Sequence, residues 1–177
     1  RDTAEWPLDR GPLHVAVNVS PATIEYGDVL SCVRRAAAIW GLEVERFTVE
    51  VTENGIIATG GAALEVLRQL RDAGVRVSID DFGTGNSSLA YFRDIPADEV
   101  KIDKSFILSM ADDRSHKLVK SIIDLAHAFD LVVVAEGVET AEAAATLRQQ
   151  GCDVLQGYYF SKPVPQRELL GYFAASL

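Results

Sequence analysis

The chain is poor in the residues that disulfide frameworks and nucleophilic active sites require. Its 177 residues include two cysteines and three histidines. Cys32 and Cys152 lie far apart in apolar surroundings, which predicts buried free thiols and fits a reducing compartment. His14, His116 and His127 show no metal-ligand spacing. His127 lies among helical residues, where a hydrogen-bonded structural histidine is the simpler interpretation. No Ser-His-Asp or Cys-His set is therefore indicated.

Long apolar runs and an excess of positive charge are also absent. The longest apolar run, near Leu131–Ala135, is far too short to cross a bilayer, and no signal peptide is evident. We therefore expect no direct membrane insertion of this segment. The net charge of −9 argues against binding DNA, because such proteins present a basic face. A small anionic ligand remains compatible where cations mediate the contact. The chain lacks an initiator Met, so we expect it to be part of a longer protein.

What the chain does contain is an alternation of short β-branched runs with longer segments of helical period. Nearly continuous apolar character predicts parallel strands over His14–Val19, Phe47–Val51, Arg76–Ile79, Glu99–Ile102, Leu131–Ala135 and Val154–Tyr159. Helices are predicted over Asp28–Trp40, Gly61–Ala73, Ser115–Phe129 and Thr140–Gln150. This alternation predicts one α/β domain over residues 1–177 with a parallel sheet or barrel. Since a closed (β/α)₈ barrel has eight strands, about six of its eight units are expected here.

A polar side chain stands at or near the carboxyl end of each predicted strand. In chain order these residues are Asn18, Glu50, Asp80 with Asp81, Lys101, Glu136 and Gln156. The carboxyl ends of parallel barrel strands share one rim, and enzymes with this architecture build their active sites there. A rim built only for packing would carry Val or Ala instead. The pattern therefore predicts an active site rather than surface decoration.

Oxygen ligands dominate this set, which indicates divalent metal chemistry. Carboxylates this close raise one another's pKa values, and a hard cation such as Mg²⁺, Mn²⁺ or Ca²⁺ relieves that conflict. The adjacent Asp80 and Asp81 suggest two ions, which can activate water and stabilise both oxygens of an in-line phosphoryl displacement. Lys101 adds a positive charge for a phosphate or for orienting the water. The glycine-rich segment Phe82–Leu89 is either a mobile loop over the site or a plain turn.

At these positions the chain resembles the EAL family of bacterial cyclic di-GMP phosphodiesterases. The matching stretches run in family order over nearly the whole chain: Val17–Ser20, Glu50–Glu53, Asp80–Leu89, Lys101–Asp103, Ala135–Thr140 and Gln156–Tyr158. The resemblance implies a modified TIM barrel that hydrolyses the second messenger cyclic di-GMP to linear pGpG with Mg²⁺ or Mn²⁺. It also implies a larger multidomain signalling protein, with this domain in the cytoplasm or on the cytoplasmic side of a membrane anchor. A homodimer is suggested by the family alone.

The resemblance also assigns roles to individual residues. The residues that resemble metal ligands are Asn18, Glu50 and Asp80 for one ion, with Asp80, Asp81 and Glu136 at the second. The residues that resemble catalytic residues are Lys101, Asp81 and Glu136, the last being the position most often proposed as general base. Glu53 resembles the anchor of the loop Gly83–Ser88, which includes Thr84 and Gly85. Asp103 and Gln156 resemble supporting residues of the site.

The chain departs from the family pattern in two places. Asn86 stands where the family usually has Tyr. The Glu-Ala-Leu motif, whose Glu is a metal ligand in the family, is expected upstream, on one of two first strands that this chain lacks. One alternative is therefore a degenerate EAL-like module that binds cyclic di-GMP or a protein partner without hydrolysis. Another is a metal-dependent lyase or aldolase barrel for a phosphosugar. The intact later motifs favour the phosphodiesterase over both.

Overall fold

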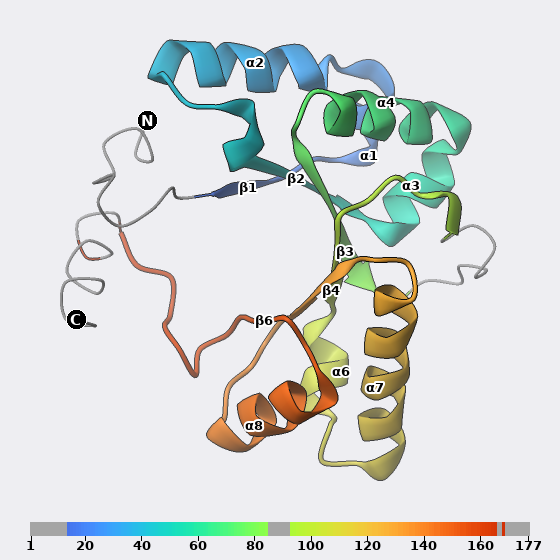
Figure 1. Ribbon diagram of the computed structural model, residues 1–177, viewed down its shortest axis with the longest axis vertical. Coiled ribbons are helices and arrows are strands. Elements are labelled where there is room, and N and C mark those ends of the chain that lie inside the picture. The colour runs from blue at the N-terminus through green and yellow to red at the C-terminus, as the bar shows by residue number, and fades with distance from the viewer. Residues whose placement is uncertain (1–13, 85–92, 166–167, 169–177) are drawn as a thin grey trace.

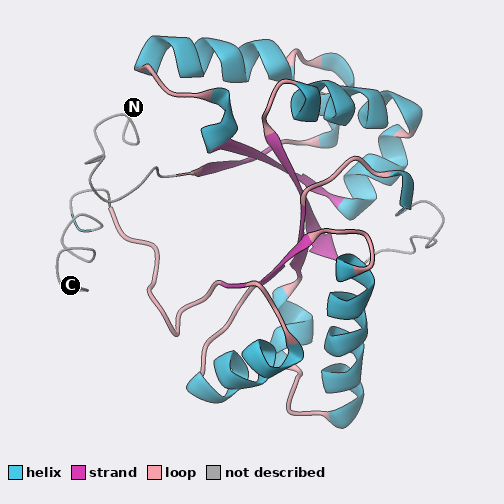
Figure 2. Ribbon diagram, viewed as in Figure 1, coloured by secondary structure: helices cyan, strands magenta, loops and turns pink. Residues whose placement is uncertain are grey.

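The computed structural model describes residues 14–84, 93–165 and 168 (Figure 1). These residues form one six-stranded sheet in the order β1-β2-β3-β4-β5-β6, and every neighbouring pair is parallel. The strands are β1 Val15–Asn18, β2 Phe47–Thr52, β3 Arg76–Phe82, β4 Glu99–Ile102, β5 Val132–Ala135 and β6 Val154–Leu155. Figure 2 shows the sheet curved into a half-barrel with the helices on its outer side. The predicted α/β fold with parallel strands is confirmed.

The helices follow the strands in turn, as βαβ connections require. They are α1 Pro21–Tyr26, α2 Val29–Trp40, α3 Glu53–Thr59, α4 Gly61–Asp72, α6 Lys104–Leu108, α7 Asp113–His127 and α8 Ala141–Gln150, with a 3₁₀ turn η2 at Val44–Arg46. Several begin at Ser, Thr or Asp caps whose side chains accept a backbone N–H one turn into the helix. Gly41 and Gly151 end α2 and α8 in the left-handed conformation, which glycine adopts without a steric penalty.

Alternation along the strands separates the core from the concave face. In β3, Val77 and Ile79 are fully buried with the apolar residues of the helices, as are Val100 and Ile102 in β4. The residues between them turn toward the inside of the curved sheet, because successive strand side chains point to opposite faces. This inner face carries polar groups. Ser78, for example, donates a 2.8 Å hydrogen bond to Glu99 across the β3–β4 pair.

Three details of the sequence prediction are wrong. The sixth strand ends at Leu155 rather than Tyr159, because the chain turns there and binds the neighbouring loop: Val138 N–H donates to the Gln156 carbonyl, and Tyr159 N–H donates to the Val138 carbonyl. The short helices α1, α3 and α6 were not predicted. Cys32 is exposed, since it lies on α2 beside the edge strand β1, where no further described element packs.

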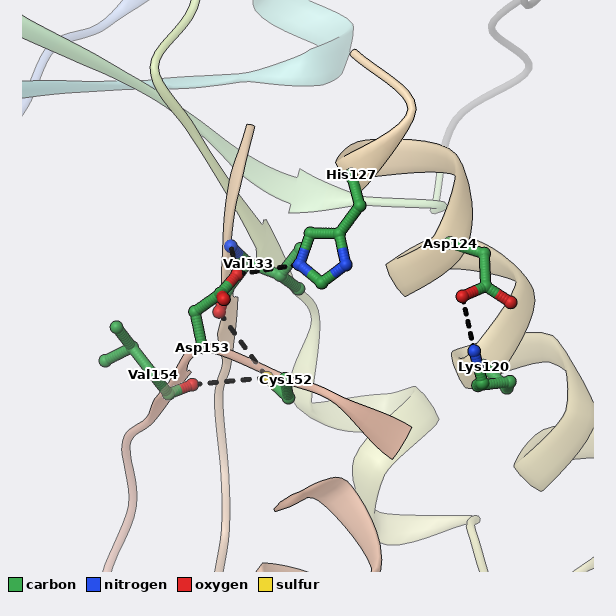
Figure 3. Close-up of polar contacts among 7 residues, drawn as sticks. All are labelled: Lys120, Asp124, His127, Val133, Cys152, Asp153 and Val154. Atoms are coloured by element: carbon green, nitrogen blue, oxygen red, sulfur yellow. Dashed lines mark hydrogen bonds and ion pairs between the residues drawn. The ribbon is translucent and has the colours of Figure 1, made fainter. Parts of the chain in front are cut away.

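The other thiol and His127 have structural partners at the end of the sheet away from the polar rim (Figure 3). Cys152 is buried and donates to two backbone carbonyls, and burial raises the pKa of its thiol to about 11. His127 Nε2 lies 2.9 Å from Asp153, which also accepts the Val133 N–H at 2.8 Å. Partial burial opposes the ionisation of Asp153, but these hydrogen bonds outweigh it and hold its pKa below the ordinary value. His127 is thus a structural residue, as predicted. No helix in the described part of the chain is long and apolar enough to cross a membrane.

Candidate functional site

The centre of the polar rim is the ammonium of Lys101. Its Nζ lies 2.6 Å from Glu136, 3.1 Å from Glu50 and 3.3 Å from Asp80. The lysine side chain is 7% exposed, and the three carboxylates are 9 to 21% exposed. Four groups that are far apart in the sequence, from β2, β3, β4 and the end of β5, therefore meet at one point. The predicted convergence of these residues is present in the structure.

The strand pattern explains why these side chains meet. Lys101 is flanked in β4 by Val100 and Ile102, which are fully buried against the helices, so Lys101 points to the concave face. Glu50 is flanked in the same way by Val49 and Val51 in β2. Parallel register places the strands' carboxyl ends together. Alternation thus places charged groups on the inner face of otherwise apolar strands.

The electrostatic balance favours a charged Lys101. Burial alone would lower the pKa of Lys101, but hydrogen bonds and charges from Glu136 and Glu50 outweigh it and raise the pKa above the ordinary value. The cation therefore stays protonated at neutral pH and offsets part of the negative charge. Three carboxylates around a single ammonium still carry an excess of negative charge. A site with that balance attracts further cations.

Asp80 and Asp81 occupy an irregular end of β3. The β3–β4 register shifts between Ile79 and Phe82, and Asp81 has a φ of 54°, a left-handed conformation that Asp tolerates better than most residues. Asp80 accepts the Asp81 N–H at 3.0 Å, and the Asp81 carbonyl accepts the Thr84 hydroxyl at 2.8 Å. Burial, followed by the charges of Asp80 and Asp103, raises the pKa of Asp81. The irregularity lies where two successive aspartates stand at the carboxyl end of β3.

Glu53 holds the base of the loop that follows these aspartates. It is 2% exposed, and its Oε2 accepts the N–H of Gly83 at 2.9 Å across 30 residues of sequence. Glu53, predicted to anchor this loop, therefore makes a direct hydrogen bond to its backbone. Thr84 is the last described residue of this loop. Gly85 and Asn86, which the sequence placed in the same loop, lie outside the described residues.

Asn18, Asp103 and Gln156 lie around this centre in different ways. Asn18 is the register partner of Glu50, so the two share a face, but Asn18 is exposed. Asp103 caps α6 by accepting the Ser105 N–H at 2.9 Å and also binds the Ser105 hydroxyl. Its pKa is lowered, because these bonds outweigh partial burial. Gln156 is exposed just after β6, and its N–H donates to Ala135, next to Glu136.

The donor set fits a hard divalent cation. Oxygens of Glu50, Asp80 and Glu136 converge on a single cationic nitrogen, and carboxylate oxygens are the preferred ligands of Mg²⁺ and Mn²⁺. Within residues 14–84 and 93–165, no three His, Cys, Asp or Glu side chains are already arranged as a metal site. The distances to Lys101 are those of ion pairs, not of metal bonds. The geometry therefore shows a cluster of carboxylates around Lys101 and does not define metal positions.

Sequence reasoning missed one element of the site, the helix α6. It begins directly after β4, and its Phe106 lies against Gly83. The signal that could have found it was Asp103 followed by Ser105, a capping pattern at the end of the predicted fourth strand.

Comparison with known proteins agrees with this geometry. The EAL domain family matches residues 1–163. A relative from Pseudomonas aeruginosa, cyclic di-GMP phosphodiesterase NbdA, is 41% identical over 164 residues, which covers 92% of this chain and 21% of that protein. An uncharacterized protein from Azorhizobium caulinodans is 43% identical over 168 residues, covering 92% of this chain and 23% of that protein. The chain thus spans less than a quarter of the length of these relatives.

Among solved structures, the PaMucR phosphodiesterase in complex with c-di-GMP is 38% identical, with a TM-score of 0.88 over 95% of this chain and 69% of that one. This likeness confirms the barrel class of the fold, since the six parallel strands superpose on part of an EAL barrel. The matched family covers more than nine-tenths of the chain. The chain belongs to the EAL domain family.

Proposed function

We propose that residues 1–177 are part of an EAL-type phosphodiesterase domain, and that this domain hydrolyses cyclic di-GMP to linear pGpG in a reaction dependent on Mg²⁺ or Mn²⁺. One observation carries the proposal: the convergence of Glu50, Asp80 and Glu136 on Lys101 at the carboxyl ends of parallel strands. Support comes from relatives described as cyclic di-GMP phosphodiesterases. A Klebsiella pneumoniae relative, BlrP1, has been solved as a manganese/cy-diGMP complex.

The oxygen ligands would hold the metal, with two ions as the proposed number. The proposed ligands are Asn18, Glu50, Asp80, Asp81 and Glu136. Bound there, Mg²⁺ or Mn²⁺ would supply the positive charge that activates water and stabilises the phosphoryl transition state. Asp80 lies beside both Lys101 and Asp81, so it is the residue best placed to serve both ions.

The remaining roles belong to the chain's own side chains. Lys101 would donate to a non-bridging phosphate oxygen or to the attacking water by exchanging one of its three present carboxylate partners. Glu136, which lies 2.6 Å from Lys101, would accept the proton that the water loses. The water oxygen bonds to phosphorus, one ester P–O bond breaks, and the departing ribose oxygen takes up a proton. Glu53 keeps the loop base at Gly83 in place beside this centre. Asp103 and Gln156 would hold α6 and the adjoining loop.

The assay is hydrolysis of cyclic di-GMP by the complete gene product with Mg²⁺ or Mn²⁺, followed by chromatography of pGpG. Asp80→Asn should lower the rate at least about 10²-fold while the fold survives, because a group that contacts both ions contributes several kcal/mol. The matched control is Asp113→Asn, since Asp113 is an exposed aspartate on α7 paired only with Lys117 among the described contacts. Near-wild-type turnover by Asp80→Asn at saturating metal would refute the assignment.

Binding separates the phosphodiesterase from a module that only recognises the nucleotide. Calorimetric titration of cyclic di-GMP into the wild-type protein with Ca²⁺ tests recognition, and the Mg²⁺ assay tests turnover. Binding without turnover would show a non-catalytic EAL module. We also propose that the domain is part of a larger multidomain protein, and the greater length of the relatives supports this. A cytoplasmic location and a homodimer are further parts of the proposal.

A further inference from the structure

The short helix α6 lies between the loops that follow two of the carboxylate-bearing strands. On one side is Gly83, two residues after Asp81. A Cβ placed on Gly83 would lie 3.0 Å from Cε2 and 3.3 Å from Cζ of the Phe106 ring, and 3.5 Å from Ile122 of α7. Gly83 also has a φ of +92°, which disfavours other residues. The base of this loop therefore rests directly on Phe106.

On its other side α6 meets Gly137, the residue after Glu136. A Cβ on Gly137 would lie 2.6 Å from Cβ and 3.3 Å from Cα of Lys104, the first residue of α6. Gly137 also has a positive φ, of +70°. A side chain at this position would therefore force the backbone of α6 away from the loop. The two glycines let α6 pack closely against both loops at once.

The helix itself is held firmly in place. Asp103 caps its first turn through the Ser105 N–H, and Ile107 is buried in the core. The strand before it, β4, ends at the fully buried Ile102, whose carbonyl accepts the Glu136 N–H at 3.2 Å. Movement of α6 would therefore disturb the core as well as the rim. A rigid element between two loops fixes the distance between them.

We infer that α6 is a spacer that sets the separation between the Asp80–Asp81 pair and Glu136, with Phe106 as its positioning residue. The inference rests on the proposed function, because it concerns the same carboxylates. Glu53 accepts the Gly83 N–H, and the Phe106 ring fills the space that a Cβ on Gly83 would need. Small displacements of metal-binding or reacting groups cost about 10- to 100-fold in affinity or rate. Phe106 touches no reacting atom and acts through the backbone.

The test compares Phe106→Leu with Phe129→Leu in the complete gene product. Both rings are partly buried and pack on the same core, but Phe129 lies between α7 and β5, near the opposite ends of the strands. Four quantities are measured: exchange of the Gly83 amide by NMR, the Kd of Mn²⁺ by calorimetry without substrate, and kcat and KM for cyclic di-GMP. Thermal melting gives the stability of each variant.

We expect Phe106→Leu to speed Gly83 amide exchange about tenfold and to weaken Mn²⁺ binding about tenfold. Its kcat should fall about 10- to 100-fold with a smaller change in KM. Phe129→Leu should lose similar stability with all four quantities unchanged. Equal Gly83 exchange and Mn²⁺ affinity in the two variants would overturn the spacer role. Because these two readouts need no turnover, they test α6 even if the wild-type protein does not hydrolyse cyclic di-GMP.

Discussion

Replacement of Lys101 by Met tests the charge arrangement at the centre of the site without any assumption about turnover. Met has nearly the length of Lys and keeps most of its packing, so the change chiefly removes the ammonium. Glu50, Asp80 and Glu136 would then face one another in a site where none is more than 21% exposed. The variant should be less stable than the wild type for electrostatic reasons.

The size of the effect follows from the geometry. At an effective dielectric constant of about 20, each ion pair near 3 Å has a gross attraction of about 5 kcal/mol. The cost of burying the charges and the repulsion among the carboxylates offset most of this. Removal of one partner from a buried ion pair typically destabilises a protein by about 3–5 kcal/mol. For a domain of this size that corresponds to a fall in Tm of about 6–20 °C.

The pH dependence follows from the raised pKa of Lys101. A group whose pKa is higher in the folded state contributes its full stability below the unfolded value, 10.5, and loses it only as the pH rises through the folded value. The difference in stability between wild type and Lys101→Met should therefore be constant from pH 6 to 9. It should shrink only in stronger base.

Divalent cations should stabilise the variant more than the wild type, because in the wild type a metal competes with Lys101 for the same oxygens. At a Mn²⁺ concentration of 100 times Kd, the gain is about 2.7 kcal/mol. The assay is thermal melting with and without Mn²⁺, and the control is Lys120→Met, which removes an exposed ion pair with Asp124 (Figure 3). If Lys101→Met melts no lower than Lys120→Met and gains no more from Mn²⁺, the account of this charge cluster is wrong.

Two further predictions concern other hydrogen-bonded carboxylates. Glu53→Ala should speed exchange of the Gly83 amide and lower the free energy of unfolding by about 2–3 kcal/mol. Glu53→Gln keeps an acceptor for this N–H, so it should lose about half as much stability. Equal effects of the two substitutions would contradict a role through this hydrogen bond. Asp153 has a lowered pKa, so its contribution to stability is present above its unfolded value of 3.8 and is lost as the pH falls through the folded value. Asp153→Asn should therefore lower the free energy of unfolding by about 0.5–1 kcal/mol at pH 7, a modest loss because the Asp153 side chain is 42% exposed. The loss should be smaller at pH 3. Denaturant unfolding that shows the same difference between wild type and variant at both pH values would argue against this.

The fold could be predicted because strand burial leaves a strong signal in the sequence. Strands covered on one face by helices and enclosed on the other by a curved sheet are apolar over most of their length, as Val132–Ala135 is. The sixth strand was overestimated because Gly157–Phe160 continues the apolar pattern although its backbone bonds to the loop at Val138. An apolar run alone cannot distinguish a strand from a turn, and here Tyr158, Tyr159 and Phe160 are exposed.

The centre of the site could be predicted for a related reason. A charged residue inside an apolar strand, as at Glu50 or Lys101, is costly unless it has a partner, so its presence indicates a cluster. The detailed geometry could not be predicted in the same way. The φ of 54° at Asp81 and the register shift beside it arise from contacts across strands, and no local pattern encodes them.

The support of the site shows a further limit of sequence reasoning. Gly83 and Gly137 read as ordinary turn glycines, and both do have positive φ values. What makes each position restrictive is the neighbour that a Cβ would meet: Phe106 at 3.0 Å and Lys104 at 2.6 Å. Both neighbours belong to one five-residue helix that is too short to show a helical period. If close packing against α6 governs these positions, then Gly83→Ala should be tolerated better with Phe106→Leu than alone, since Leu vacates the space that the new methyl group needs. Additive losses of stability in that double-mutant cycle would show that the positive φ, and not α6, sets the requirement for glycine.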